Sequence, residues 1–175
     1  KNGFQTLLVE EKPNLGGSTI YQDSENFKIN NQNSGSWLEK EINEIKKLRN
    51  LDIKTRTSVA AYHGYNFLLA RESLTDHLPI EQRKNKTRHK LLKIRAKKVI
   101  CATGSLERPL IFHNNDRPGI LLSSAIKKYA DLFGVACGEK NILLTNNDSA
   151  YETVISLIQK GINVEAVIDN REEID

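Results

Sequence analysis

Glu10 has the residue type and the position that a dinucleotide-binding site requires. It follows the strand-like segment 4–9 and precedes the glycine pair Gly16 and Gly17 by six residues. In a dinucleotide-binding βαβ unit, the second strand ends in an acidic residue that accepts hydrogen bonds from the adenosine ribose hydroxyls. Glu11 competes by position, but the spacing to the glycine pair favours Glu10. An ordinary solvated glutamate at a strand end is the alternative interpretation.

A second stretch with the features of a nucleotide site covers residues 100–109. An apolar run over 99–102 predicts a strand buried on both faces of a sheet and ending at Ala102. Thr103 and Gly104 follow, and neither has the bulk to stop a cofactor from lying across the strand end. A buried strand that ends in a glycine turn, with no ligand, is the alternative.

One arginine, Arg108, precedes the turn-forming segment 114–119, and another, Arg117, lies within it. Arg108 and Arg117 can face a pyrophosphate, because a guanidinium group binds phosphate oxygens bidentately. The sequence leaves open a second arrangement, in which each arginine pairs with a neighbouring acid, Glu107 or Asp116. Segment 114–119 combines short polar side chains with a Pro-Gly pair, which predicts a rigid crossover between two nucleotide-binding domains.

The carboxyl-terminal part of the chain repeats the logic of the amino-terminal part. Residues 141–152 predict a strand, a tight turn and the start of a helix that stops at Gly161. A second strand over 164–168 then ends at Asp169, which occupies the position that Glu10 holds in the first unit.

The turn of this second unit is degenerate. Aligned on a G-x-G-x-x-G turn, Thr145, Asn147 and Ala150 occupy the three glycine positions. Alanine commonly replaces the third glycine, whereas threonine and asparagine place side chains where a pyrophosphate approaches the backbone. Both of these side chains can still donate hydrogen bonds, so the sequence leaves nucleotide binding by this unit open.

A basic segment explains the net charge of +4. Residues 83–98 contain nine Lys or Arg and no acid, and the remaining 17 basic residues face 22 acidic ones, a balance of −5. The segment lacks the aromatic residues that stack on nucleic-acid bases, so a nucleic-acid partner is not predicted. We expect instead a β-hairpin in which 62–70 pairs with 90–99 across a polar tip.

Between the glycine pair and this hairpin, a helix is predicted to start at Ser36. Ser36 would be the N-cap residue and Glu39 its capping-box partner. A strand over 52–59 is expected to follow. This helix and strand, with the strand before Glu10, are the elements that must position the first site.

Composition excludes several classes of protein. The 175 residues are 38% hydrophobic, enough for a core, and contain no apolar run near the ~20 residues of a membrane span. No signal-peptide pattern opens the chain, so a cytoplasmic location is expected. The two cysteines and four histidines have no ligand spacing, so neither a metal site nor a disulfide framework is predicted. No catalytic residue is predicted.

These observations predict an α/β fold of the two-dinucleotide-binding-domain, flavoprotein-like (Rossmann) type, incomplete and with a β-hairpin insertion. The expected domains are a partial first dinucleotide-binding domain over 1–110, with the hairpin at 60–100, a crossover over 111–138 and the start of a second dinucleotide-binding domain over 139–175. The predicted cofactor-binding residues are Glu10, Glu11, Lys12, Gly16, Gly17, Ser18, Ala102, Thr103, Gly104, Arg108, Asn115, Arg117, Gly119, Thr145, Asn147 and Asp169.

Several of these motifs together resemble the α subunit of heterotetrameric sarcosine oxidase. The resemblance rests on the run 102–112, on 114–120, on 145–151 and on 167–169, in that order and spacing. More distantly, the Ala-Thr-Gly and Glu-Arg-Pro elements are similar to those of nucleotide-binding subunits in amine and proline dehydrogenase complexes.

The resemblance implies a cofactor-binding role within a larger enzyme. Such complexes oxidatively demethylate sarcosine to glycine, formaldehyde and hydrogen peroxide, with the amine oxidised at a flavin in the β subunit. The α subunit's nucleotide-binding region is expected to hold a non-catalytic NAD. FAD and FMN are expected elsewhere in the complex, and the β, γ and δ subunits are the expected partners.

Two further expectations follow. The chain is expected to be a fragment, preceded by an apolar strand and a G-x-G-x-x-G turn and unable to hold NAD alone. The main competing function is a structural or interaction module that binds no nucleotide. A stand-alone disulfide reductase is disfavoured because the chain lacks a Cys-x-x-Cys pair.

Overall fold

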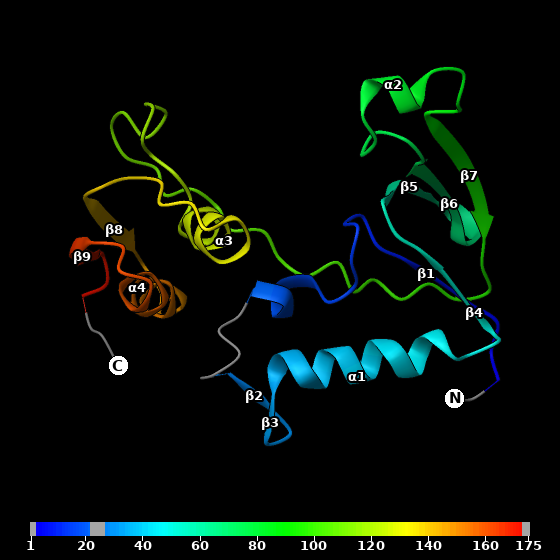
Figure 1. The fold of residues 1–175 in the computed structure, drawn as a ribbon, viewed down its shortest axis with the longest axis horizontal. Helices are drawn as coiled ribbons and strands as arrows, with labels where there is room; N and C mark the ends of the chain where they lie inside the picture. The colour runs from blue at the N-terminus through cyan, green and yellow to red at the C-terminus, as the bar shows by residue number, and fades with distance from the viewer. Residues whose placement is uncertain (1–2, 22–26, 173–175) are drawn as a thin grey trace. The chain divides into compact units, whose positions relative to one another are not determined.

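A computed structural model describes residues 3–21 and 27–172 of the chain. The described residues form two compact units: the first contains 3–20 and 27–102, and the second contains Tyr21 and 103–172. Figure 1 labels the helices and strands of both units.

The first unit begins with a pair of parallel strands. Strand β1 (Thr6–Val9) pairs with β4 (Leu51–Lys54), with Thr6 opposite Leu51 and Val9 opposite Lys54. The connection between them contains the 3-10 helix η1 (Gly17–Tyr21), the short antiparallel pair β2 (Lys28–Ile29) and β3 (Gln32–Asn33), and helix α1 (Ser34–Lys46). Parallel strands need such a long crossover, and their carboxyl ends then lie at the same edge of the sheet.

The N-cap of helix α1 (Ser34–Lys46) lies three residues earlier than the sequence predicted. Asn33, not Ser36, is the N-cap residue, and its Oδ1 accepts hydrogen bonds from the backbone N–H groups of Gly35 and Ser36. Asparagine caps a helix as well as serine does, so the capping-box pattern with Glu39 did not identify the start. Residues 22–26, part of the polar loop before this helix, lie outside the described residues.

The rest of the first unit is a three-stranded antiparallel sheet. Strand β5 (Thr57–His63) pairs with β6 (Phe67–Ser73), which pairs with β7 (His89–Arg95). The 3-10 turn η2 (Gly64–Asn66) joins β5 to β6, and helix α2 (Ile80–Arg83) lies between β6 and β7, beyond the strand ends (Figure 1).

Two predicted strand boundaries in this sheet were wrong. The predicted strand 62–70 is divided by η2, where Tyr65 and Asn66 have positive φ, so its first residues belong to β5. The predicted strand 52–59 is likewise divided, because Arg56 has a φ of 50° and turns the chain between β4 and β5. The first break contains Gly64, a residue type typical of turns, whereas the second break, at Arg56, contains neither glycine nor proline.

The second unit contains a strand–helix–strand motif with parallel strands. Strand β8 (Asn141–Thr145) leads into α4 (Ser149–Gln159), and β9 (Val164–Asp169) returns beside β8. This confirms the predicted elements of the carboxyl-terminal segment. Leu143, Ala150 and Val154 form the buried cluster, because one face of α4 packs on the strands.

Helix α3 (Ser123–Phe133) packs against α4 through a polar clamp. Asp131, with only 7% of its side chain exposed, accepts from Lys127 Nζ at 2.8 Å and from Lys160 Nζ at 2.9 Å. Ser156 Oγ lies 3.1 Å from both lysine nitrogens. A buried carboxylate needs such partners. The polar clamp of Asp131, Lys127, Ser156 and Lys160 therefore joins the end of α3 to α4.

The predicted buried strand at 99–102 is wrong. These residues form no strand, Ile100 is 91% exposed and Cys101 is also exposed. A strand is stabilised by the backbone groups of its neighbours, and none of the described strands pairs with this segment.

Candidate functional site

Glu10 lies at the carboxyl end of β1, where the parallel pair ends. Its backbone N–H donates to Lys54 O and its carbonyl accepts from Thr57 N, both at 2.9 Å. Its side-chain Oε1 accepts from the backbone N–H of Lys12 at 2.8 Å, and none of the described residues donates to Oε2. The half-buried carboxylate is therefore held at the strand end with one oxygen available to a ligand.

Glu11 is less suited to this role. Its carboxylate lies 2.6 Å from Lys12 Nζ, and both side chains are more than half exposed. Glu11 thus forms a solvated ion pair beside the strand end, whereas the Glu10 carboxylate is part of the turn itself. The geometry favours Glu10, as the spacing to the glycine pair did.

The two glycines of the loop have different structural roles. Gly16 has a φ of 127°, and a Cβ placed there would lie 2.6 Å from Leu38 Cδ2, so Gly16 lets the loop pack closely on α1. Gly17 has a φ of 56° and open space around it. Ser18 follows in η1 and is exposed. Of the two glycines, only Gly17 leaves its backbone open to a ligand.

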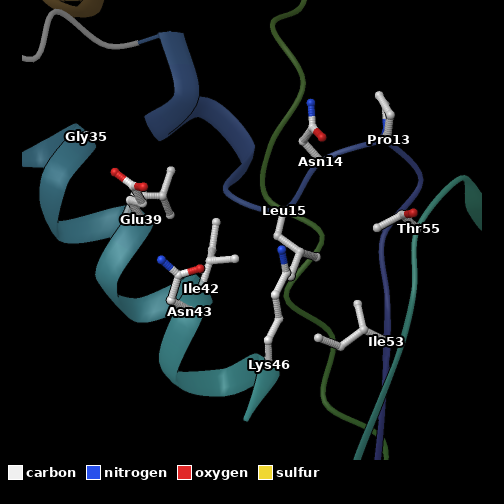
Figure 2. Close-up of a pocket in the computed structure, with 11 residues that line it drawn as sticks. Pro13, Asn14, Leu15, Gly35, Glu39, Ile42, Asn43, Lys46, Ile53 and Thr55 are labelled. Atoms are coloured by element: carbon white, nitrogen blue, oxygen red, sulfur yellow. The ribbon is translucent and has the colours of Figure 1, made fainter.

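A pocket of about 450 Å³ lies between this loop, α1 and the end of β4 (Figure 2). Leu38 and Ile42 of α1 and Ile53 of β4 supply apolar walls, and Lys46 extends from the helix toward Leu15. The full lining is Pro13, Asn14, Leu15, Gly35, Leu38, Glu39, Ile42, Asn43, Lys46, Ile53 and Thr55. None of these was predicted as a site residue; the apolar spacing of Leu38 and Ile42 was the available signal.

Residues 102–108 form no helix or strand and are largely exposed, and Gly104 has a φ of 70°. Ala102 ends the first unit, and Thr103, Gly104 and Arg108 belong to the second. No ion pair to an acid is formed by Arg108 or Arg117 within the described part of the chain, so the alternative pairing with Glu107 and Asp116 is not observed.

Glu107 instead caps helix α3. Its Oε1 accepts from Ser123 N at 3.1 Å and Ser123 Oγ at 2.8 Å, and its Oε2 accepts from Ser124 N at 2.7 Å. Partial burial raises the pKa of this carboxyl, but the hydrogen bonds from Ser124 and Ser123 outweigh it and hold the pKa below its usual value. The carboxylate thus occupies the amino terminus of α3, a position where helices favour negative charge.

Segment 114–119 forms successive turns. Asn115 Nδ2 donates to Leu110 O at 2.9 Å, Arg117 N donates to Asn114 O, and Gly119 has a φ of 94°. The amide of Asn115 is therefore engaged within the segment, while the side chain of Arg117 is exposed.

The turn before α4 is closed by its own side chains. Thr145 Oγ1 donates to Asn147 O at 2.8 Å and accepts from Asn147 N at 3.1 Å. Asn147 Oδ1 accepts from the backbone N–H of Ser149, the first residue of α4, at 3.1 Å and from its hydroxyl. In a phosphate-binding turn these N–H groups would face the pyrophosphate.

Asp169 is engaged through both carboxylate oxygens. Arg171 Nε lies 3.0 Å from Oδ1, and Arg171 Nη2 and Tyr151 Oη lie 2.7 and 2.9 Å from Oδ2. Arg171 also reaches Asp148 at 2.7 Å. The Arg171 guanidinium lowers the pKa of Asp169, and the bond to Asp169 raises the pKa of Tyr151.

No group of three or more His, Cys, Asp or Glu side chains among residues 3–21 and 27–172 is arranged to hold a metal ion. In the same residues, no helix is long and apolar enough to cross a membrane.

The fold is of the mixed α/β class and is similar to that of a solved proline dehydrogenase. The crystal structure of L-proline dehydrogenase from P. horikoshii matches 97% of this chain and 31% of its own, with a TM-score of 0.67 and 26% sequence identity. No family model matches the chain.

Curated sequence relatives identify the kind of protein more specifically than this structural match does. The chain is 35% identical over 171 residues to the sarcosine oxidase subunit alpha of Corynebacterium sp. (strain P-1), and 30% identical over 176 residues to that of Rhizobium meliloti (strain 1021). These alignments cover 98% and 97% of this chain, and the chain spans 17% of the length of each relative. The chain is therefore homologous to one segment of an oxidoreductase subunit.

Proposed function

We propose that the chain is the NAD-binding portion of the alpha subunit of a sarcosine oxidase-like complex. In the complex, sarcosine, dioxygen and water would yield glycine, formaldehyde and hydrogen peroxide. The similarity of nearly the whole chain to sarcosine oxidase alpha subunits supports this assignment. The flavin chemistry, with FAD and FMN, would take place outside this chain, in a cytoplasmic assembly with beta, gamma and delta subunits.

The observation that carries the proposal is the position of Glu10. Its carboxylate is fixed at the carboxyl end of a parallel strand, with Oε1 engaged by the turn and Oε2 open to a hydroxyl donor. This is the placement by which dinucleotide-binding domains hold the adenosine ribose. The residues of the first unit therefore fit the ribose end of NAD, with Lys12, Gly17 and Ser18 beside it.

The NAD would have a binding role and not a catalytic one. We propose no proton donor, base or nucleophile in this chain. Arg108 and Arg117 would bind phosphate, and Thr103 and Gly104 would leave room for the cofactor. The two-dinucleotide-domain organisation is part of the same proposal.

The experiment is to identify the nucleotide released by acid from the complete subunit, purified with its partner subunits, by mass spectrometry. We expect NAD in a stoichiometric amount. A preparation that assembles and oxidises sarcosine but releases no dinucleotide would contradict the proposal.

A second candidate function is favoured by the closed turn before α4. Thr145 and Asn147 form hydrogen bonds within the turn, and Asp169 is bound by Arg171. Side chains engaged in this way are what a structural module of an amine or proline dehydrogenase-like complex requires. If both units lack a nucleotide, this interaction module is the better description of the chain. The nucleotide analysis above separates the two, because only the first candidate contains NAD.

A further inference from the structure

The connection between β6 and β7 is long and is held in shape by its own side chains. We call residues 74–88 the basic loop; it contains α2 and no large buried apolar side chain. Connections of this length that carry their own packing are commonly functional, because the fold itself needs only a short turn to join two antiparallel strands.

Asp76 is the centre of that internal structure. Its Oδ2 accepts from Ser73 Oγ at 3.0 Å and contacts His89 Nε2, and its Oδ1 accepts from Arg88 Nε. The Arg88 and His89 hydrogen bonds hold the pKa of Asp76 well below its usual range. The carboxylate thus stays ionised and keeps both ends of the loop together.

Arg83 forms a second internal tie. Its Nε donates to Leu78 O at 2.6 Å and its Nη2 donates to Asp76 O. Because the guanidinium group donates to two backbone carbonyls, it fixes the path of the chain around α2. The order of the loop therefore does not depend on its exposed lysines, Lys84 and Lys86.

The side chains that the loop presents include two lysines, an isoleucine and, beside the isoleucine, the acidic Glu81. Lys84 and Lys86 are exposed and form no ion pair within the described residues, and Ile80 is 73% exposed. Beyond Glu81 no acidic residue occurs until after position 98. A preorganised loop that carries exposed lysines and an exposed apolar side chain is suited to meet an acidic protein surface that has an apolar centre.

Other anionic partners fit less well. Residues 74–98 contain no Phe, Tyr or Trp, which nucleic-acid-binding grooves use for stacking and which anchor proteins at membrane interfaces. Ile80 supplies an apolar contact that a phosphate backbone does not use.

We propose that the basic loop is a docking surface for an acidic patch on another protein subunit, with Lys84 and Lys86 meeting carboxylates and Ile80 entering the apolar centre of the patch. This inference rests on the part of the proposed function that places the chain in a multisubunit complex. Arg88 and Arg83 position the loop and do not themselves face the partner.

The test uses the complete subunit, co-produced with its partner subunits, and measures assembly by analytical ultracentrifugation at several salt concentrations. The test variant is Lys84→Glu with Lys86→Glu, which leaves the ties of Asp76, Arg83 and Arg88 intact. The matched control is Lys28→Glu with Lys40→Glu, which makes the same charge change at two exposed lysines elsewhere in the first unit. A further variant, Ile80→Ala, tests the apolar contact.

We expect the Lys84/Lys86 variant to weaken assembly at least tenfold at low salt and to abolish most of its salt dependence, with the control close to wild type. Ile80→Ala should weaken assembly with the salt dependence retained. Equal effects of the test and control variants, or no effect of either, would overturn the proposal. So would salt-sensitive binding of the wild type to random duplex DNA or to phosphatidylserine vesicles that the Lys84/Lys86 variant loses.

Failure of the proposed function gives a different result. A wild-type subunit that does not assemble with its partners at any salt concentration contradicts the multisubunit assignment and the docking proposal together. A wild-type complex that forms and is unaffected by the Lys84/Lys86 variant contradicts the docking proposal alone.

Discussion

Glu10 and Asp169 occupy equivalent positions in the two units, and their surroundings differ. Glu10 follows β1 and Asp169 is the last residue of β9, and each of these strands pairs in parallel with its neighbour. Glu10 uses one oxygen to accept a backbone N–H of its own turn, whereas both oxygens of Asp169 are taken by Arg171 and Tyr151. An acidic residue at a strand end is therefore not sufficient evidence for a ribose site; the hydrogen bonds that its two oxygens already accept must also be known.

The largest expected effect is on NAD affinity, which substitution of Glu10 should lower and substitution of Asp169 should not. Glu10→Ala in the complete subunit should weaken NAD binding at least tenfold, because charge-assisted hydrogen bonds to the ribose contribute about 1.5–3 kcal/mol each. Asp169→Ala should change the affinity less than twofold, a difference of about 0.4 kcal/mol. Isothermal titration calorimetry measures both, with Glu11→Ala as the control; equal losses for Glu10 and Asp169 would remove the distinction.

The next effect concerns the loop that follows Glu10. Gly16→Ala should lower the free energy of unfolding by roughly 2–4 kcal/mol, because the new Cβ meets Leu38 and the backbone has a conformation that alanine rarely adopts. Gly17→Ala has open space and should cost only about 1–2 kcal/mol. Urea unfolding of the complete subunit gives both values. A cost for Gly17→Ala as large as that for Gly16→Ala would contradict the close packing of the loop on α1.

The smallest expected effect tests the structural role of Asp169. Because its pKa is lowered in the folded state, Asp169 stabilises the fold above its unfolded pKa of about 4, and this contribution disappears as the pH falls through the folded value. Asp169→Asn should therefore lower the Tm at neutral pH and reduce the loss of Tm on acidification. Scanning calorimetry at pH 7 and in acid checks this, with Asp52→Asn as an exposed control. Parallel acid profiles for wild type and variant would exclude a stabilising role for the Asp169 carboxylate.

Local patterns predicted the elements of the second unit well. Its strand, helix and strand each have a clear apolar period and lie beside one another, so local sequence and packing agree. The strand expected at 99–102 has an equally apolar sequence and does not form, because a strand requires neighbouring backbone that local sequence does not report. The N-cap at Asn33 was missed because several residues there can cap a helix.

The candidate site was predictable only in part. The spacing between Glu10 and the glycines identified the strand-end position, but not that Gly16 packs on Leu38. The engagement of Asp169 had a signal in the sequence, since Arg171 is two residues away and Tyr151 lies in the first turn of the helix that packs beside it. Recognising it required knowing which way these side chains point, and spacing alone does not give that.

Because Glu107 caps helix α3, the segment between Glu107 and the helix can change in length without moving the start of the helix. Glu107 and Ser123 are 16 residues apart, so their hydrogen bonds close a ring around a segment that has no helix or strand of its own. The entropy of closing such a ring grows only slowly with its size, by about 0.6 kcal/mol for each doubling. Residues inserted between Glu107 and α3 would therefore enlarge the ring at little cost, and related proteins can differ in length here while the start of the helix stays where it is.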